Sequence, residues 1–426
     1  MKAGIDRKMC SLLRTKPAEF GKSKTDGTPA RESVRRGGGD AFCSAAIFLL
    51  VLSLCVAVFY VGGRLLFAPS ADCEKAAVEA VAKFSDADEA LVERLRKNLE
   101  LRQSVAYLDF LMLRRAADAR DFASAARFAD SIKGSFYEPM GRAYVYASKL
   151  LRSGKFSMDF DSGDASEDFF KNLYLYTALK KKSSPRADAF GAKLFKSARA
   201  LPQARLKAYA ETVCTEFLAA ELPAECVGFF EKALPNAYDI SAMDTEYIVA
   251  NRAAMPEYPR SLVAKNNVWR KYRLFVDAAR SPNPSENLEK AKRKGERLFR
   301  KTMVQILEKA CRLYLERGDS DGAARLVREV LRDSSLDDLE LKTTFGYNSM
   351  HAQGAAVLVL CRRPDAAKRV VFLPKSPPAR YACAAAITRA LGEAGNPAAA
   401  LDYFELSKTP AFRLKLNFDI FRCCKF

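Results

Sequence analysis

Residues 301–333 read KTMVQILEKACRLYLERGDSDGAARLVREVLRD and contain two helical patterns separated by one tight turn. The first half carries small or apolar residues at intervals of three or four positions, namely Leu307, Ala310, Cys311 and Tyr314. The turn falls at Gly318-Asp319, and the second half repeats the spacing with Ala323, Val327 and Val330. This period places each set on one face of a helix, so the segment predicts a pair of helices packed through small residues.

Other segments repeat this pattern along the chain. Lys207–Asn236 carries Cys214, Phe217, Cys226, Phe230 and Ala233, and Ala382–Lys408 carries Thr388, Leu391, Gly395, Ala400 and Phe404. Weaker versions occupy Leu108–Ile132, Leu173–Arg199 and Met350–Pro374. Turn signals occur at 120–121, 222–223, 317–319, 363–365 and 395–397, and the last two are 32 to 33 residues apart. Because no convincing run of alternating β-branched residues occurs, we predict an all-α fold with a period in the low thirties.

The order of small, small, aromatic, turn, small and apolar positions resembles a tetratricopeptide repeat (TPR). The resemblance covers about half of the region after residue 75 and implies a TPR-like α-solenoid of paired antiparallel helices. The sequence departs from that repeat at Leu391, where an aromatic residue is usual, and most units lack the closing proline. The stretches Phe156–Asp168 and Pro235–Ser261 fit no unit.

The resemblance also implies a binding surface. In such stacks the first helix of each unit lines a concave groove that receives peptides or partner helices. The groove-facing positions of the clearest units would be Gln305, Glu308, Arg312, Glu316, Arg389 and Glu393. Their charges alternate in sign, which suits a partner surface of mixed charge.

A second feature is the uncharged run AFCSAAIFLLVLSLCVAVFYVGG at residues 41–63. Its 23 residues would reach about 34 Å as a helix, slightly more than a hydrocarbon core of about 30 Å. We therefore predict a transmembrane helix. A cleaved signal peptide fits less well, because its apolar region is shorter and Pro69-Ser70-Ala71 is a poor cleavage site.

The flanking charges predict the orientation of this span. Residues 1–40 hold ten Lys or Arg, whereas the twenty residues after the span hold three. Basic segments tend to stay cytoplasmic, so we expect an inner-membrane protein with a cytoplasmic N-terminus and a periplasmic C-terminal region. The predicted organisation is a basic flexible tail at 1–40, the span at 41–63, a linker at 64–74 and the TPR-like domain at 75–426.

Composition narrows the function classes. The net charge is +19, which could suggest a nucleic-acid partner. We do not expect one, because basic and acidic residues are mixed along the predicted helices and the region is predicted to lie outside the cytoplasm. The eleven cysteines include no CxxC motif; Cys214 and Cys226 either pair as a disulfide or fill small packing positions. Cys423-Cys424 has no assigned role.

The sequence shows no catalytic constellation. His351 is the only histidine and lies in a helical stretch, which excludes a two-histidine zinc motif. No glycine-rich phosphate loop or GxSxG elbow occurs. We therefore expect no metal, no cofactor, no small-molecule substrate and no enzymatic activity.

These observations favour a non-enzymatic, membrane-anchored scaffold or adaptor that joins proteins of a bacterial cell envelope. Its partners would be other envelope proteins, bound through the repeats, and the bilayer, bound through residues 41–63. The layout is similar to that of collar scaffolds of periplasmic flagella. Two alternatives stay open: a periplasmic chaperone-like accessory of protein translocation, and a cell-wall-active enzyme.

Overall fold

The computed structural model divides into two compact units, Met1–Gly63 and Arg64–Phe426. It describes residues 70–83, 88–154, 162–233, 307–308, 311–332, 341–343, 346–348, 350–374 and 376–417, all in the second unit. The predicted tail at 1–40 and span at 41–63 lie outside the described residues. Among the helices that the structure does describe, none is both long enough and apolar enough to cross a bilayer.

The first described half of the second unit is entirely helical. Its elements are α2 (Ala71–Val78), η2 (Glu79–Lys83), α3 (Glu89–Asn98), α4 (Arg102–Asp118), α5 (Phe122–Ser131), α6 (Glu138–Ser153), α7 (Ala165–Lys181), α8 (Ala187–Ala200), α9 (Gln203–Ala219) and α10 (Pro223–Ala233). The element η2 is a π-helix that continues α2 directly. Because α2 begins at Ala71, the helical domain starts inside the stretch 64–74 that the sequence predicts as a linker.

The second described half begins with helical residues at 307–308 and 311–315. It continues with α16 (Ser320–Leu331), β1 (Leu341–Thr343), β2 (Gly346–Asn348), α17 (Met350–Leu360), α18 (Pro364–Val370), α19 (Pro377–Glu393), α20 (Pro397–Lys408) and α21 (Pro410–Asn417). The two strands pair antiparallel, with Leu341 opposite Asn348. The prediction of an all-α fold is confirmed except for this pair, because three-residue strands are too short to show a recognisable alternation.

One turn recurs between the paired helices. In six places a residue with positive φ ends the first helix: Arg120, Ser183, Glu221, Gly318, Arg362 and Gly395. Each time the next amide bonds back across six residues, as from Asp319 N to Tyr314 O (2.9 Å), which satisfies a carbonyl at the helix end. The five turns predicted from the sequence are all among these six.

The second helix of most pairs, α8 excepted, starts from its own sequence signal. Asp121, Asp319 and Asn396 each accept a hydrogen bond from the amide three residues later, as helix N-caps do. Proline provides the first helical residue of α10, α18 and α20. Local chemistry alone therefore specifies these helical hairpins.

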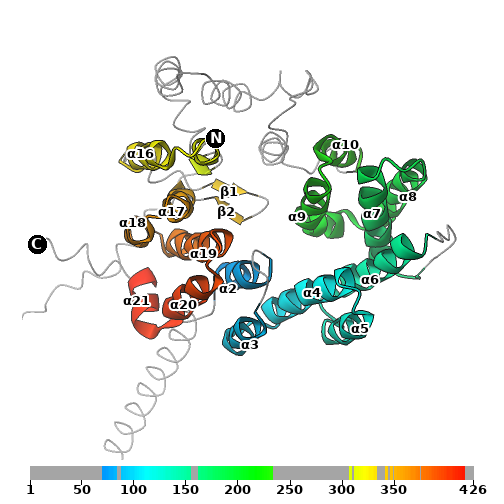
Figure 1. Ribbon diagram of the computed structural model, residues 1–426, viewed down its shortest axis with the longest axis horizontal. Coiled ribbons are helices and arrows are strands. Elements are labelled where there is room, and N and C mark those ends of the chain that lie inside the picture. Colours follow the sequence, from blue (N-terminus) through cyan, green and yellow to red (C-terminus); the bar gives the residue numbers. More distant parts are fainter. Residues whose placement is uncertain are drawn as a thin grey trace, which may run out of the picture. The chain divides into compact units, whose positions relative to one another are not determined.

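The helices form two rows. The first row consists of the helical residues 307–308 and 311–315, followed by α17, α19, α2 with η2, α4, α6, α7 and α9, and successive members contact each other. The second row consists of the hairpin partners of all these except α6, namely α16, α18, α20, α3, α5, α8 and α10. In this order the helix that opens the described chain, α2, lies between α19 and α4, so the last hairpin packs on the first helix (Figure 1).

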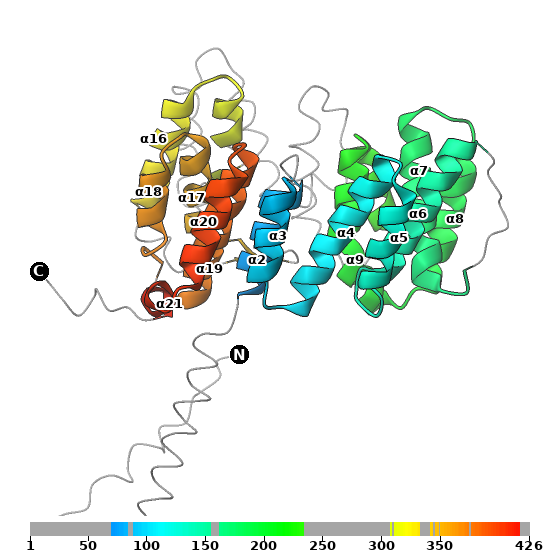
Figure 2. The same ribbon diagram turned by 60° about the horizontal axis from the view of Figure 1, so that its bottom comes forward.

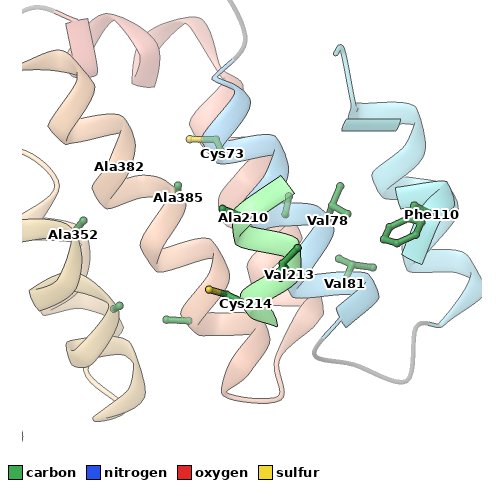
Figure 3. Close-up of a cluster of buried hydrophobic side chains, with 14 of the residues drawn as sticks. Cys73, Val78, Val81, Phe110, Ala210, Val213, Cys214, Ala352, Ala382 and Ala385 are labelled. Atoms are coloured by element: carbon green, nitrogen blue, oxygen red, sulfur yellow. The ribbon is translucent and has the colours of Figure 1, made fainter. Parts of the chain in front are cut away.

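The contact between α2 and α19 is made by small residues. Figure 3 shows Cys73 of α2 toward Ala385 of α19, whereas Val78 and Val81 lie on the opposite side, toward Phe110 of α4. All five are buried, and α2 and η2 bury nearly every side chain because helices cover them on both sides. Small side chains allow this close approach, whereas large ones would keep the helices apart.

The predicted packing positions are buried. Leu307, Cys311 and Val327 are fully enclosed, as are Phe217 and Phe404 in the other two clear units. The six cysteines within the described residues are all free and buried. Of the two alternatives for Cys214 and Cys226, a disulfide or a packing position, the structure shows the packing position. The Cys226 thiol donates to the Cys214 sulfur at 3.8 Å, without a disulfide.

Candidate functional site

The candidate site is a group of charged residues on the first row, around the junction of α19 with α2 and η2. We call this group the junction face and define it by eight residues: Lys75, Glu79, Lys83, Glu211, Glu308, Arg312, Arg389 and Glu393. Four are bases and four are acids. They come from α2, η2, α9, α19 and the helical residues 307–308 and 311–315.

Arg312 connects two helices of the junction face. Its guanidinium binds Glu308, one turn earlier, through Nε at 3.1 Å and Nη2 at 2.7 Å. The same guanidinium binds both carboxylate oxygens of Glu393 at the end of α19, with Nη2 at 2.7 Å from Oε2. Glu308 is also held by its backbone, because its amide donates to the side-chain oxygen of Gln353 in α17. Arg312 is thus fixed by two carboxylates and has little freedom to reorient.

Arg389 lies one helical turn before Glu393 and binds η2. Its Nε is 3.0 Å from Oε2 of Glu79, whose side chain is only 5% exposed, while Arg389 itself is 53% exposed. The other oxygen of Glu79 accepts a hydrogen bond from the Tyr107 hydroxyl of α4 at 3.3 Å. The buried carboxylate therefore anchors an arginine that keeps half of its side chain accessible to a partner.

Helix α9 contributes from the other end of the first row. Glu211 accepts a salt bridge from Lys75 of α2 at 2.6 Å. One turn later, Glu216 forms a largely buried ion pair with Arg114 of α4, whose guanidinium lies 4.5 Å from the centre of the Tyr144 ring. These two pairs attach α9 to α2 and α4, although α6 and α7 separate them along the row.

The pKa values of Arg389 and Glu393 are shifted by the other charged groups of the junction face. Burial disfavours the charged guanidinium of Arg389, but Glu79, Glu308, Glu211 and Glu393 together outweigh it and raise its pKa. Burial likewise opposes ionisation of Glu393, yet its hydrogen bond to Arg312 holds its pKa below the ordinary value of 4.5. Every carboxylate of the junction face thus acts on Arg389.

Aromatic side chains border these charges. Burial and the nearby Glu79 carboxylate raise the pKa of Tyr107 well above 10.0, and burial with Glu211 and Glu79 does the same for Tyr137. The two rings stack with centroids 5.2 Å apart. Neither tyrosine is an available acid at neutral pH, so both serve as neutral contact surfaces.

The backbone at this junction is unusually close. A β-carbon placed on Gly392 of α19 would lie 2.4 Å from the Cα of Ala80 in η2. Only glycine leaves room for this approach, which sets Glu79 beside Arg389. The π-helix occurs at the same place, and π-turns are often found at functional sites.

The structure brings together four of the six residues predicted to face the groove. Glu308, Arg312, Arg389 and Glu393 all belong to the junction face. Glu316 is exposed in the turn before Gly318, and Gln305 lies outside the described residues. Whether any of them binds a partner stays a prediction.

Sequence reasoning missed the residues that α2, η2, α4 and α9 supply. Lys75, Glu79 and Tyr107 precede the first repeat that the pattern detects, and Glu211 lies in the predicted unit Lys207–Asn236 but was not among the positions expected to face the groove. The signal that could have found Glu79 is weak: one acid among the small apolar residues of KAAVEAVAKF.

Other features of the described residues are weaker candidates for a functional site than the junction face. A half-open cavity of about 480 Å³ lies between α6, α7 and α8, lined by Lys171, Lys193 and Lys196 with one acid, Asp168. His351 is buried in α17, as packing would require. Within the described ranges no three His, Cys, Asp or Glu side chains are close enough to hold a metal ion.

Comparison with known proteins adds no relative: no family model, no curated protein and no solved structure matches the chain. The geometry of the chain itself therefore has to carry the functional argument.

Proposed function

We propose that the protein is a membrane-anchored, non-catalytic scaffold that binds another envelope protein on the junction face. The observation that carries this proposal is the position of Arg389, which is half exposed while one buried carboxylate holds it and three others lie nearby. Arginine fixed in this way loses little side-chain freedom on binding, which is the usual property of an interface hot spot.

The charge of the junction face supports a protein partner. Its four bases and four acids balance, so it presents no continuous positive field for a polyanion such as a nucleic acid or a phosphate-rich polymer. Arginine and tyrosine are enriched at protein interfaces, and Tyr107 and Tyr137 lie beside these charges. A polar helix or extended peptide with both signs of charge fits this surface best.

The TPR-like assignment belongs to this proposal. Its support is the recurrence of one turn geometry at six places and the two-row arrangement, in which the first helix of each pair lies in the row that carries the charges. In a TPR-like stack that row forms the ligand-binding side.

The anchor is proposed from the sequence. Residues 41–63 would span the inner membrane, with residues 1–40 in the cytoplasm and the helical domain in the periplasm. The anchor would hold the junction face near the bilayer, so that a membrane-bound partner meets it at high effective concentration.

Crosslinking in intact membranes tests the scaffold. Arg389→Glu places a negative charge beside Glu79, Glu308 and Glu393, and we expect it to reduce recovery of a stoichiometric partner at least tenfold. The matched control is Arg325→Glu on exposed α16, which makes the same charge change in the second row and should leave recovery unchanged.

The controls separate binding from folding. Circular dichroism and thermal melting of both variants must match the parent chain within a few degrees for the comparison to hold; if Arg389→Glu unfolds the domain, Arg389→Gln replaces it. Equal recovery with Arg389 and Arg325 variants would refute the junction face as the binding surface. Capture of many unrelated secreted chains without a dominant partner would favour the chaperone-like alternative.

A further inference from the structure

The large apolar side chains that remain exposed are gathered at one end of the array. Among the described residues they are Phe372 (36% exposed), Leu373 (49%), Leu406 (46%) and Leu414 (39%). The half-buried Phe412 lies among them, 5.7 Å from Phe372 between ring centres. We call these five residues the terminal patch. Single exposed apolar residues are common on proteins, but their concentration in one place marks an interaction site.

The terminal patch is built on a fixed framework. Arg380 of α19 is 2% exposed, and its guanidinium donates to the carbonyls of Pro374 (2.8 Å), Leu416 (3.2 Å) and Lys415 (3.4 Å). One buried cation thus ties the turn after α18 to the end of α21. The patch is therefore a defined surface of the fold.

Bases outnumber acids around the terminal patch, although Glu405 directly precedes Leu406 and pairs with Arg94. Between 366 and 381, and again between 406 and 417, the sequence contains Lys and Arg but no Asp or Glu. Nearby acids from other segments neutralise part of this charge, since Glu100 pairs with Lys408 and Asp365 with Lys368. Arg369 and Lys415 are exposed and form no ion pair with the described residues. Exposed apolar side chains with two such bases beside them in the sequence match a lipid surface with anionic headgroups.

The terminal patch lies at the end of the array where the chain enters it. Cys73 in the first turn of α2 donates to the carbonyl of Tyr381 (3.6 Å), and the Tyr381 hydroxyl accepts from Asn417 at the end of α21 (3.1 Å). Figure 2 shows α21 at the lower end of the array, where α18 and α20 end and α19 begins. The start of α2 and the terminal patch therefore share one end.

The chain leaves little distance between that end and the proposed anchor. The uncharged run stops at Gly63, and Ser70 caps α2. Seven residues reach at most about 25 Å when fully extended. If residues 41–63 span a bilayer, the start of α2 is held within that reach of its surface, at the end of the array that carries the terminal patch.

We propose that the terminal patch rests on the bilayer surface, inserting Leu406, Phe412 and Leu414 among anionic headgroups and fixing the orientation of the array on the membrane. This inference rests on the anchor in the proposed function and adds a second membrane contact to it. The tether makes the contact intramolecular, so a surface too small to bind lipid alone is sufficient.

The test is photocrosslinking of the full chain in nanodiscs that contain anionic lipid and a diazirine phospholipid, with crosslinked peptides mapped by mass spectrometry. We expect peptides covering 372–373 and 406–414 to be labelled at least fivefold more than peptides of α5 and α16. The double variant Leu406→Glu, Leu414→Glu should lose this excess labelling of the terminal patch. The control double variant Ala123→Glu, Ala126→Glu adds the same charge at exposed positions of α5, and its terminal patch should be labelled as strongly as in the parent chain.

The outcomes separate the two membrane claims. Labelling of 41–63 with background labelling of the terminal patch would overturn this inference and leave the anchor standing. Release of the chain by alkaline carbonate, with 41–63 unlabelled, would remove the anchor and, with it, the premise of this inference.

Discussion

Replacing Gly392 by alanine tests the contact on which the junction face depends. The added methyl group would lie 2.4 Å from the Cα, 2.5 Å from the Cβ and 2.8 Å from the carbonyl oxygen of Ala80. Carbon atoms in contact are about 3.5–4.0 Å apart, so α19 and η2 would have to separate by about 1 Å. None of the three atoms belongs to a flexible side chain that could move away.

Two opposing terms determine the size of the effect. Overpacking of a core costs about 1–3 kcal/mol, and the rigid neighbours of Gly392 favour the upper end. Alanine also gains about 1 kcal/mol over glycine inside a helix. The net expected loss of unfolding free energy is about 2 kcal/mol. Gly228 of α10 supplies the control, because a β-carbon there meets nothing within 4 Å; Gly228→Ala should stabilise by about 0.5–1 kcal/mol.

Thermal unfolding of the full chain, followed by circular dichroism, measures the difference. About 2.5–3 kcal/mol between the two variants corresponds to a gap of about 3–4 °C in melting temperature for a domain of about 350 residues. Hydrogen exchange should show the loss of protection concentrated in α2 and η2. If Gly392→Ala melts at or above the temperature of Gly228→Ala, then η2 and α19 do not approach as described, and the junction face loses its support.

Three further outcomes follow from the same structure. Arg114→Met and Glu216→Gln should each destabilise by about 3 kcal/mol, and the double variant by clearly less than their sum, as a double-mutant cycle of denaturation midpoints would show. Because the pKa of Glu393 is lowered below 4.5, its stabilising effect is complete above that value and is lost as the pH falls through the folded-state pKa; Glu393→Gln should therefore flatten the loss of stability below pH 4.5, and an unchanged slope would contradict it. Burial raises the pKa of the Cys73 thiol to about 12, so alkylation at pH 8 should modify it only on unfolding, and rapid labelling of the folded chain would count against a buried α2.

The sequence predicted the hairpins well because each depends on neighbouring residues only. Gly318 and Gly395 adopt the positive φ that ends a helix, and Asp319 and Asn396 cap the next one. Arg312 and Glu393 were both predicted to face the groove and bind each other in the structure, whereas their contact with a partner stays a prediction. The role of 41–63 as a membrane span stays a prediction.

The long-range arrangement could not be predicted in the same way. Gly392 of α19 packs against Ala80 of η2, but faces of small residues can pack against any other small-residue face and carry no information about their partner. The pairing of Glu79 with Arg389 depends on that docking and so was hidden as well. The β1–β2 pair was missed because its strands are three residues long.

The central position of α2 has a consequence for biosynthesis. This helix is among the first parts of the domain to leave the ribosome, yet α19, which covers one of its sides, begins roughly 300 residues later, a delay of about 15–60 s at ordinary elongation rates. During that interval the apolar side facing α19 has no permanent neighbour. The domain can then reach its final state only when translation is nearly complete, and a chain cut short before α19 would present an uncovered apolar helix to the proteases that remove unfinished proteins.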